Sequence, residues 1–293
     1  MMGMKRVLLL GASGQLGNLV KNSVPDSIHL KSQSRATLDI TDPLAVSQIV
    51  QEHDPTVIIN TAAFTQVDKA ETEEELAFAV NTSAVEHLVA AAAPGIRVIH
   101  LSTDFVFSEL QKQPYKPDET PLPASVYGRS KLAGESALLE AEHVNSVILR
   151  TSWLYSPKGG NFVTTMIGLM SAREELSVVN DQFGSPTSAE GLANVIWRFV
   201  MAQDAKGIHH WSDQGVITWY DFACEIQSQC LDLGILDREI PIKPIPTSGY
   251  PTPAARPVYS ALDSSSTESV LGIKATHWQV SLRKVLERLK ERH

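Results

Sequence analysis

The sequence predicts an α/β protein with a doubly wound parallel sheet, followed by a smaller mixed α/β domain at the C-terminal end. Short apolar runs alternate with helical stretches through the first half of the chain, which is the pattern of such a sheet. Beyond residue 155 this regular alternation stops. We therefore expect one domain at residues 1–155 and a second at 156–293, with some segments of the second returning to the first.

The predicted strands of the first domain are short apolar runs, and residues 57–59 and 147–149 show no polar alternation, as expected for parallel strands covered on both faces. They are residues 6–10, 27–31, 56–60, 97–101 and 146–150. The helical stretches between them are residues 15–23, 43–52, 70–79 continuing from 81 to 93, and 126–142. Thr41-Asp42-Pro43 marks one helix start, because a capping residue precedes a proline in the first helical position.

The second domain has a more mixed pattern. Helices are predicted at residues 161–172, 189–202, 219–231 and 277–290, with a short run at 176–179 between the first two, and a strand is predicted at 208–211. Six prolines between residues 241 and 257 exclude a regular helix and favour an extended loop.

Composition limits the kinds of partner that the protein can have. The chain of 293 residues carries 25 Lys and Arg against 33 Asp and Glu, a formal net charge of −8. It lacks a dense basic block, so we expect no nucleic-acid binding. No apolar run approaches the roughly 18–20 residues that span a bilayer, so we expect a cytoplasmic location without membrane contact. Only Cys224 and Cys230 are cysteines, and without a Cys/His cluster no metal site is predicted.

Three glycines follow the first predicted strand, in the segment Gly11-Ala12-Ser13-Gly14-Gln15-Leu16-Gly17. At a strand-to-helix turn, glycine lets a diphosphate approach the backbone, and the helix N-terminus offers free N–H groups to the anion. A purely structural turn is the alternative. In an alternating strand–helix pattern we interpret the first domain as dinucleotide-binding and the second as mainly substrate-binding.

The end of the second strand indicates which dinucleotide binds. NAD usually meets an acidic residue there, whereas NADP prefers a cation and small hydrogen-bond donors. Here Lys31, Ser32, Ser34 and Arg35 come first, and no acid appears before Asp39. A solvated basic turn is the alternative, but we favour NADPH.

A candidate catalytic group combines Tyr127, Lys131 and Thr103. The tyrosine and lysine are four residues apart, which puts them on one face of a helix. The lysine charge is expected to lower the tyrosine pKa towards neutrality, so that Tyr127 can give a proton to a carbonyl oxygen. Thr103 or Ser102, at the end of the fourth strand, could hydrogen-bond the same oxygen. Alternatively, both helical residues belong to an ordinary amphipathic surface.

Taken in this order, the motifs resemble the extended short-chain dehydrogenase/reductase superfamily, which has a Rossmann-like sheet. The closer resemblance, essentially end to end, is to the dTDP-4-dehydrorhamnose reductase family. The matching stretches are residues 60–63 (NTAA), 67–71 (VDKAE), 102–107 (STDFVF), 150–155 (RTSWLY), 180–187 (NDQFGSPT), 218–221 (TWYD) and 250–257 (YPTPAARP). Those beyond residue 150 bear on the substrate more than on the fold.

The resemblance implies NADPH-dependent reduction of the 4-keto group of a dTDP-6-deoxy-sugar, with NADH as another accepted cofactor. Tyr127 would be the proton donor, and Thr103 would polarise the keto group. Asp104 and Trp153 would face the sugar, and Arg256 would meet the substrate diphosphate. The implied cofactor residues are Gly11, Ser13, Gly14, Gln15, Leu16, Gly17, Ser32, Ser34, Arg35, Asp39, Ile40, Ala62, Ala63 and Phe64, with Tyr127 and with Lys131 on the nicotinamide ribose.

Other assignments remain open from the sequence. One is a non-catalytic NADP-binding regulatory subunit like that of methionine adenosyltransferase, and another is a different sugar-nucleotide ketoreductase or epimerase. A dehydratase is disfavoured because Phe105, not an acid, follows Thr103-Asp104. Leu19 stands where some relatives carry a carboxylate linked with metal-assisted pairing of subunits, so no metal is expected there, although a homodimer is compatible with the resemblance.

Overall fold

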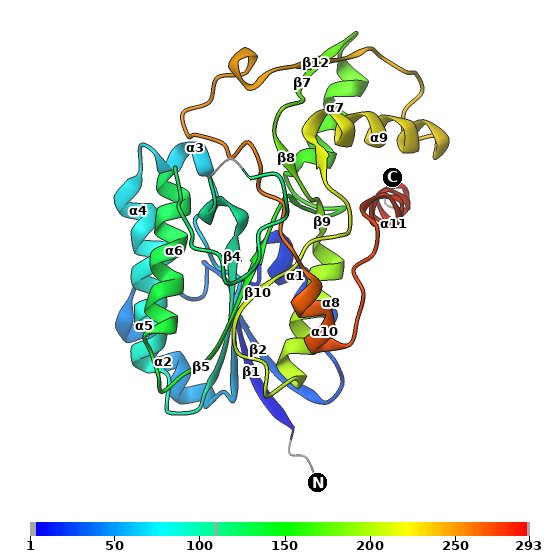
Figure 1. Ribbon diagram of the computed structural model, residues 1–293. Coiled ribbons are helices and arrows are strands. Elements are labelled where there is room, and N and C mark those ends of the chain that lie inside the picture. The colour runs from blue at the N-terminus through cyan, green and yellow to red at the C-terminus, as the bar shows by residue number, and fades with distance from the viewer. Residues whose placement is uncertain (1–3, 109–110, 292–293) are drawn as a thin grey trace.

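A six-stranded parallel sheet forms the centre of the computed structural model, which describes residues 4–108 and 111–291 (Figure 1). The strand order is β10-β5-β4-β3-β1-β2. The strands are β1 Lys5–Leu10, β2 Ile28–Gln33, β3 Val57–Asn60, β4 Arg97–Thr103, β5 Asn145–Thr151 and β10 Gly207–His210. The order reverses at β1, which lies between β2 and β3, so the doubly wound sheet predicted from the sequence is confirmed.

Helices cover both faces of this sheet (Figure 1). On one face lie α2 (Pro43–His53), α5 (Ala84–Ala91) and α6 (Val126–Leu139), and on the other lie α1 (Gln15–Asn22) and α8 (Ala189–Met201). Leu8 and Leu10 of β1 pack in the first layer, and Val7 and Leu9 pack in the second. Burial of both faces explains why the sequence shows unbroken apolar runs.

The helical region after β3 is more broken than predicted. It consists of α3 (Val67–Ala70), α4 (Glu74–Phe78), a π-helical turn at Ala79–Ser83 and then α5. A π turn inserts one extra residue into each hydrogen-bonded loop, and such turns often occur at functional sites. Here it carries Asn81, whose side chain is described with the site.

A second lobe stands beyond the carboxyl ends of the strands (Figure 1). Its core is formed by α7 (Phe162–Ala172), α9 (Trp219–Asp232) and α11 (Trp278–Lys290), around a two-stranded sheet of β7 (Leu176–Val179) and β12 (Ile242–Ile245). The proline-rich stretch therefore contains a short strand, which tolerates Pro244 because β12 pairs only with β7. The remaining small elements are β6 Leu154–Tyr155, β8 Phe183–Gly184, β9 Thr187–Ser188, β11 Ile217–Thr218 and two 3₁₀ turns at Asp104–Val106 and Thr247–Gly249.

The chain crosses between the two parts several times. After residue 155, β10 joins the central sheet beside β5, and α8 packs on α1 in the layer below it. The helix α10 (Ser265–Leu271), which the sequence did not predict, lies beside β10 (Figure 1). Among the described residues, none of the helices combines the length and apolar character that a membrane crossing needs.

Candidate active site

The glycine turn between β1 and α1 is packed too closely for side chains. Gly11 has φ +79°, and a Cβ there would lie 2.6 Å from the backbone N of Ala62. A Cβ on Gly17 would lie 2.2 Å from the carbonyl oxygen of Gly11. Ser13 and Gly14 are exposed, and Gly14 caps α1 without a side-chain hydrogen bond. The first N–H groups of α1 thus remain available, as a bound diphosphate requires.

The turn after β2 presents basic side chains next to this glycine turn. Gln33 at the end of β2 accepts a hydrogen bond from the backbone N of Ala12 through its carbonyl oxygen, which joins the two turns. Lys31 and Arg35 are not buried, and neither forms an ion pair within residues 4–108 and 111–291. Asp39 instead accepts two hydrogen bonds from Thr41, which lower the pKa of its carboxyl group.

Ser32 and Ser34 lie at this turn, and Ser34 N donates to Thr37 Oγ1 over 3.0 Å. Ile40 is half-buried, and Leu16 of α1 is buried. Gln15 joins the two lobes, because its Nε2 donates to the carbonyl oxygen of Leu154 and its Oε1 accepts from Asn161 Nδ2.

The segment after β3 is held in place from beneath. Asn60 Oδ1 accepts from the backbone N of Ala62 over 3.1 Å. Asn81 is buried and bonds both backbone groups of Phe64, accepting from its N–H at 2.8 Å and donating to its C=O at 3.1 Å. These contacts fix residues 62–64, including Ala63, along the edge of the sheet beside the glycine turn.

Tyr127 lies in the first turn of α6, against the carboxyl end of β4. Ser125 caps this helix by accepting from the backbone N of Gly128, so the tyrosine is fixed at its start. The Tyr127 side chain is 9% exposed and packs edge-on against Phe105, with ring centroids 5.6 Å apart. Its hydroxyl is hydrogen-bonded with Thr103, so the structure brings together this predicted pair.

The predicted effect of Lys131 on Tyr127 is wrong. Burial raises the pKa of Tyr127 to about 12, and the Asp104 charge adds to this rise, while the Thr103 hydrogen bond opposes it. The Lys131 ammonium points elsewhere: Nζ donates to the carbonyl oxygen of Leu101 at 2.5 Å and lies 3.2 Å from His100 Nε2. Burial lowers the pKa of Lys131 to about 8. For both groups the effect of burial on the pKa is larger than any effect expected from their four-residue spacing.

Asp104 supports Thr103 from the buried side. Thr103 Oγ1 donates to Asp104 Oδ1 over 3.1 Å and accepts from the backbone N of Phe105. Burial raises the pKa of Asp104 to about 6, with hydrogen bonds from Ser260 and Thr103 working against this. Part of the Asp104 population is therefore protonated near neutral pH.

A cavity of about 810 Å³ opens beside these residues, between the sheet and the second lobe. Phe105, Trp153 and Ser260 are among its lining residues, and Phe105 is the residue that packs against the Tyr127 ring. Trp153 adopts φ +44°, a strained backbone for a bulky residue, and its ring stacks on Trp219 with centroids 3.5 Å apart. Of the two tryptophans, only Trp153 was expected to face this cavity.

Arg256 reaches the same cavity from the proline-rich segment. Its guanidinium is 2.8 Å from Asp68 of α3 and lies 5.8 Å from the centroid of the Phe105 ring. The backbone N of Ala254 also donates to Asp68, so this carboxylate holds the segment across the cavity mouth. The Arg256 side chain is 21% exposed.

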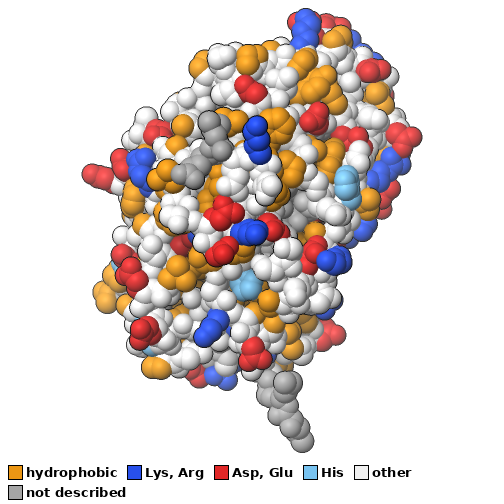
Figure 2. All heavy atoms as spheres, in the orientation of Figure 1, with side chains coloured by type: hydrophobic (Ala, Val, Ile, Leu, Met, Phe, Trp, Pro, Cys, Tyr) orange, Lys and Arg blue, Asp and Glu red, His pale blue; other side chains and the backbone are white. Residues whose placement is uncertain are grey.

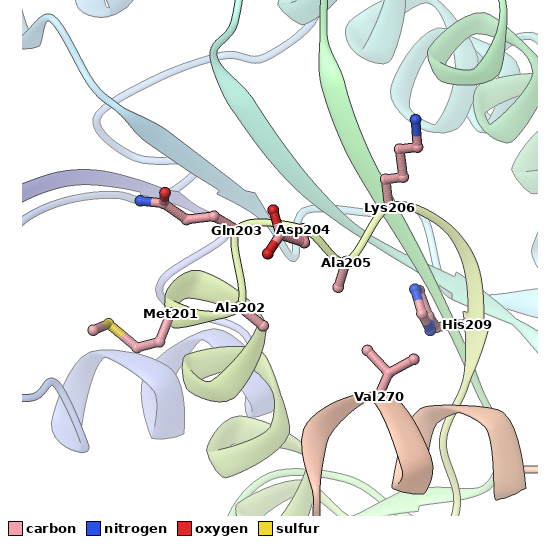
Figure 3. Close-up of a pocket in the computed structure, with 8 residues that line it drawn as sticks. All are labelled: Met201, Ala202, Gln203, Asp204, Ala205, Lys206, His209 and Val270. Atoms are coloured by element: carbon pink, nitrogen blue, oxygen red, sulfur yellow. The ribbon is translucent and has the colours of Figure 1, made fainter.

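A second hollow, of about 670 Å³, lies at the opposite edge of the sheet (Figure 3). It is formed where the loop after α8 enters β10 and includes Lys206, His209 and Val270. This edge is remote from the glycine turn, so the hollow is not part of the candidate site. On the face drawn in Figure 2, Lys and Arg side chains are interspersed with Asp and Glu, without a continuous basic surface. Within the described residues no cluster of His, Cys, Asp and Glu could hold a metal ion.

Comparison with known proteins places this site in a family. Residues 4–291 match the family described as RmlD substrate binding domain. The chain belongs to this family. Among its relatives, the dTDP-4-dehydrorhamnose reductase of Escherichia coli (strain K12) is 38% identical over 97% of each chain. The reductase of the same name from Sinorhizobium fredii is 38% identical over 96% of each. The resemblance to these reductases is therefore confirmed.

Solved structures of RmlD-family relatives share the whole fold. The dTDP-4-dehydrorhamnose reductase of Bacillus anthracis, in complex with NADP, is 34% identical with a TM-score of 0.90, over 97% of this chain and 99% of that one. The Clostridium acetobutylicum reductase is 36% identical with the same TM-score and the same coverage. At 16% identity and a TM-score of 0.78, a UDP-glucose 4-epimerase from Thermus thermophilus shares the fold alone.

Some residues of this RmlD-family site were not found from the sequence. Asn81, Asp68, Trp219 and His100 each touch a predicted site residue or its backbone neighbour. One signal was present for two of them: an asparagine within an apolar helical run, and a histidine within an otherwise apolar strand, both call for a buried hydrogen-bond partner. Asp68 and Trp219 lie in the matching stretches 67–71 and 218–221, but the sequence assigned neither of them a role.

Proposed function

We propose that this protein reduces the 4-keto group of dTDP-4-dehydro-L-rhamnose to give dTDP-L-rhamnose, with NADPH as the reductant. The observation that carries the proposal is the Tyr127–Thr103 pair at the carboxyl end of β4, beside the glycine turn, in a chain of the RmlD family. A protonated phenol next to a second hydroxyl suits the delivery of a proton to a ketone oxygen.

The residues around the glycine turn fit a dinucleotide. The backbone at Gly11 and Gly17 leaves no room for a Cβ, and the uncapped start of α1 can receive the diphosphate. Ala62, Ala63 and Phe64 would line the nicotinamide side, and Lys31 and Arg35 would receive a 2′-phosphate. When bound, NADPH supplies the hydride that the reduction needs.

Within this site, Tyr127 is the proposed proton donor. With a pKa of about 12 its hydroxyl stays protonated at neutral pH, so a proton is always present at Oη for transfer to the substrate oxygen. To orient that oxygen, the Thr103 hydroxyl would turn towards it the one hydrogen that it donates to Asp104 in the structure. Lys131, charged below its pKa of about 8, lies one helical turn away and is proposed to hold the nicotinamide ribose.

The basic turn provides a test of cofactor choice. Replacing Lys31 and Arg35 together by Gln should raise the Kd for NADPH by about 10²- to 10⁴-fold, since two charged contacts to phosphate are lost and each contributes about 1.5–3 kcal/mol. The Kd for NADH should change much less, and fluorescence titration measures both. Lys21→Gln, on the exposed last turn of α1, is the control for loss of a lysine charge outside this turn. Equal weakening of both cofactors would show that the turn does not read the 2′-phosphate.

Arg256 is proposed to bind the substrate diphosphate, exchanging Asp68 for the phosphate oxygens. Arg256→Gln should raise the KM for the dTDP-sugar by about tenfold or more with little change in kcat, because a charge-assisted contact made equally in ground and transition states is lost. Steady-state kinetics give both values. Arg283→Gln, which removes an ion pair of α11 far from the cavity, should leave KM unchanged. If both variants behave alike, Arg256 has no part in substrate binding.

The experiment that decides the function follows NADPH absorbance with dTDP-4-dehydro-L-rhamnose and identifies the sugar product by NMR. Stoichiometric NADPH loss with dTDP-L-rhamnose formation supports the reductase. Isomerisation without NADPH consumption would indicate an epimerase, and binding without turnover would indicate a regulatory subunit. A homodimer and a cytoplasmic location stay predictions.

A further inference from the structure

His100 lies in the middle of β4, buried between the sheet and α6. Its side chain is 1% exposed. The Nε2 atom lies 3.2 Å from Lys131 Nζ, and the Nδ1 atom lies 3.1 Å from Asn60 Nδ2. Asn60 is the register partner of His100 on the adjacent strand β3, so parallel pairing itself brings the two side chains together.

The hydrogen bonds around Asn60 fix the tautomer of the imidazole. Asn60 Oδ1 accepts from the backbone N–H of Ala62, so the amide must turn its NH₂ group towards His100 Nδ1. That nitrogen is therefore an acceptor, and a neutral ring carries its proton on Nε2. Burial and the Lys131 charge hold the pKa of His100 well below its usual value, so the ring is neutral.

The Nε2–H group consequently points at the lysine amine. A neutral amine can accept this hydrogen bond, whereas an ammonium group, which has only donors, cannot. To accommodate the ammonium, His100 must move its proton to Nδ1, and Asn60 must then rotate and give up its bond to Ala62. The charged and uncharged forms of Lys131 thus require different hydrogen bonds along the same chain of residues.

We propose that His100 is a positioning residue that, with its tautomer set by Asn60, presents a donor to the Lys131 amine and thereby controls where in the pH range this lysine loses its charge. The inference deepens the proposed function, on which its catalytic consequence rests. The effect of His100 on the protonation of Lys131 can be measured without catalytic turnover.

The other groups that face Lys131 do not provide this control. On α6, Tyr127 is uncharged, and Glu135 lies one turn further on, where its charge favours the ammonium. Arg150 of β5 holds that carboxylate at 2.6 Å, which reduces its effect. The Leu101 carbonyl oxygen of β4 accepts from either form of the lysine. Besides burial, His100 alone among these neighbours opposes the charge through a hydrogen bond.

Two substitutions reverse the polarity of this contact. In His100→Gln the side-chain amide can turn its oxygen to Nζ, which an ammonium prefers. In Asn60→Asp, an isosteric change, the carboxylate still accepts from Ala62 but now also accepts from Nδ1–H, leaving Nε2 as an acceptor for the ammonium. Both variants should raise the pKa of Lys131 by about one unit or more, since the charged form gains a partner.

NMR titration of ¹³C-labelled lysine side chains measures this directly, with Lys131→Met assigning the resonance. The wild-type midpoint should lie near the value of about 8 set by burial, and both variants should titrate higher. His209→Asn is the control, because His209 is also buried but lies by the hollow at the other edge of the sheet (Figure 3). An unchanged midpoint in either folded variant would overturn the proposal.

Kinetics provide the second measurement. If the charged lysine is needed, kcat/KM should fall as pH rises through about 8 and be retained below it. In His100→Gln this fall should move to higher pH together with the NMR midpoint, while the His209→Asn profile stays in place. A shifted midpoint in a protein that reduces no dTDP-sugar would remove the proposed function and keep the inference; reductase activity with an unshifted midpoint would do the reverse.

Discussion

Tyr127→Phe is expected to lower turnover by about 10²- to 10⁴-fold, the usual contribution of a general acid. The substitution removes only the hydroxyl that is bonded with Thr103 and leaves the ring, which packs on Phe105. NADPH binding should therefore be nearly unchanged. Initial rates at saturating substrate and a fluorescence titration of the cofactor measure the two quantities separately.

Tyr155→Phe is the matched control for this experiment. Tyr155 is fully buried in the core of the second lobe, and within the described residues its hydroxyl has no hydrogen-bond partner. Loss of that hydroxyl should leave turnover unchanged. Near-normal turnover of Tyr127→Phe would remove this tyrosine from proton transfer. A large loss of cofactor affinity would instead assign it to binding.

The parts of this protein that were predictable from sequence are those with local signals. Unbroken apolar runs indicated inner strands such as β3 and β5, because these strands are buried on both faces. The glycine spacing gave the nucleotide turn, and the position of Thr103 at a strand end placed it near Tyr127, because carboxyl ends of parallel strands share one edge. In each case a few adjacent residues carry the information.

The pKa of Tyr127 could not be predicted in this way. The four-residue spacing puts Lys131 on the same helix face, but the direction of its ammonium depends on Leu101 and His100 in β4. The degree of burial also depends on how α6 seats against the sheet. Both are properties of the packed structure, and desolvation reverses the shift that the helix alone suggests.

The mouth of the cavity depends on contacts between distant segments. Asp68 and Arg256 are 188 residues apart in the chain, and neither lies in a pattern that indicates an ion pair. The pairing of β10 with β5 in the central sheet was unpredictable for the same reason, because a short run that includes two histidines does not indicate its partner strand. Such contacts depend on how distant segments pack in the complete fold, so no short stretch of sequence predicts them.

The buried ion pair behind the site leads to a large expected effect on stability. Glu135 of α6 and Arg150 of β5 are each 1% exposed and 2.6 Å apart, and Ser102 Oγ donates to the carboxylate. Glu135→Leu should lower the free energy of unfolding by about 3–5 kcal/mol, because it leaves the Arg150 charge buried without its partner. Arg150→Met should cost a similar amount, since the stranded charge is then the carboxylate. Denaturant unfolding measures both.

The double variant Glu135→Leu with Arg150→Met should be less destabilised than the sum of the two single changes. It buries neither charge, and removal of both desolvation penalties offsets the lost attraction. Arg238 and Glu174 provide a surface pair for comparison, and there single changes should have far smaller effects. Additive losses at Glu135 and Arg150 would mean that the pair is not coupled. Because Glu135 lies one turn beyond Lys131 on α6, this ion pair also joins that helix to β5 behind the site.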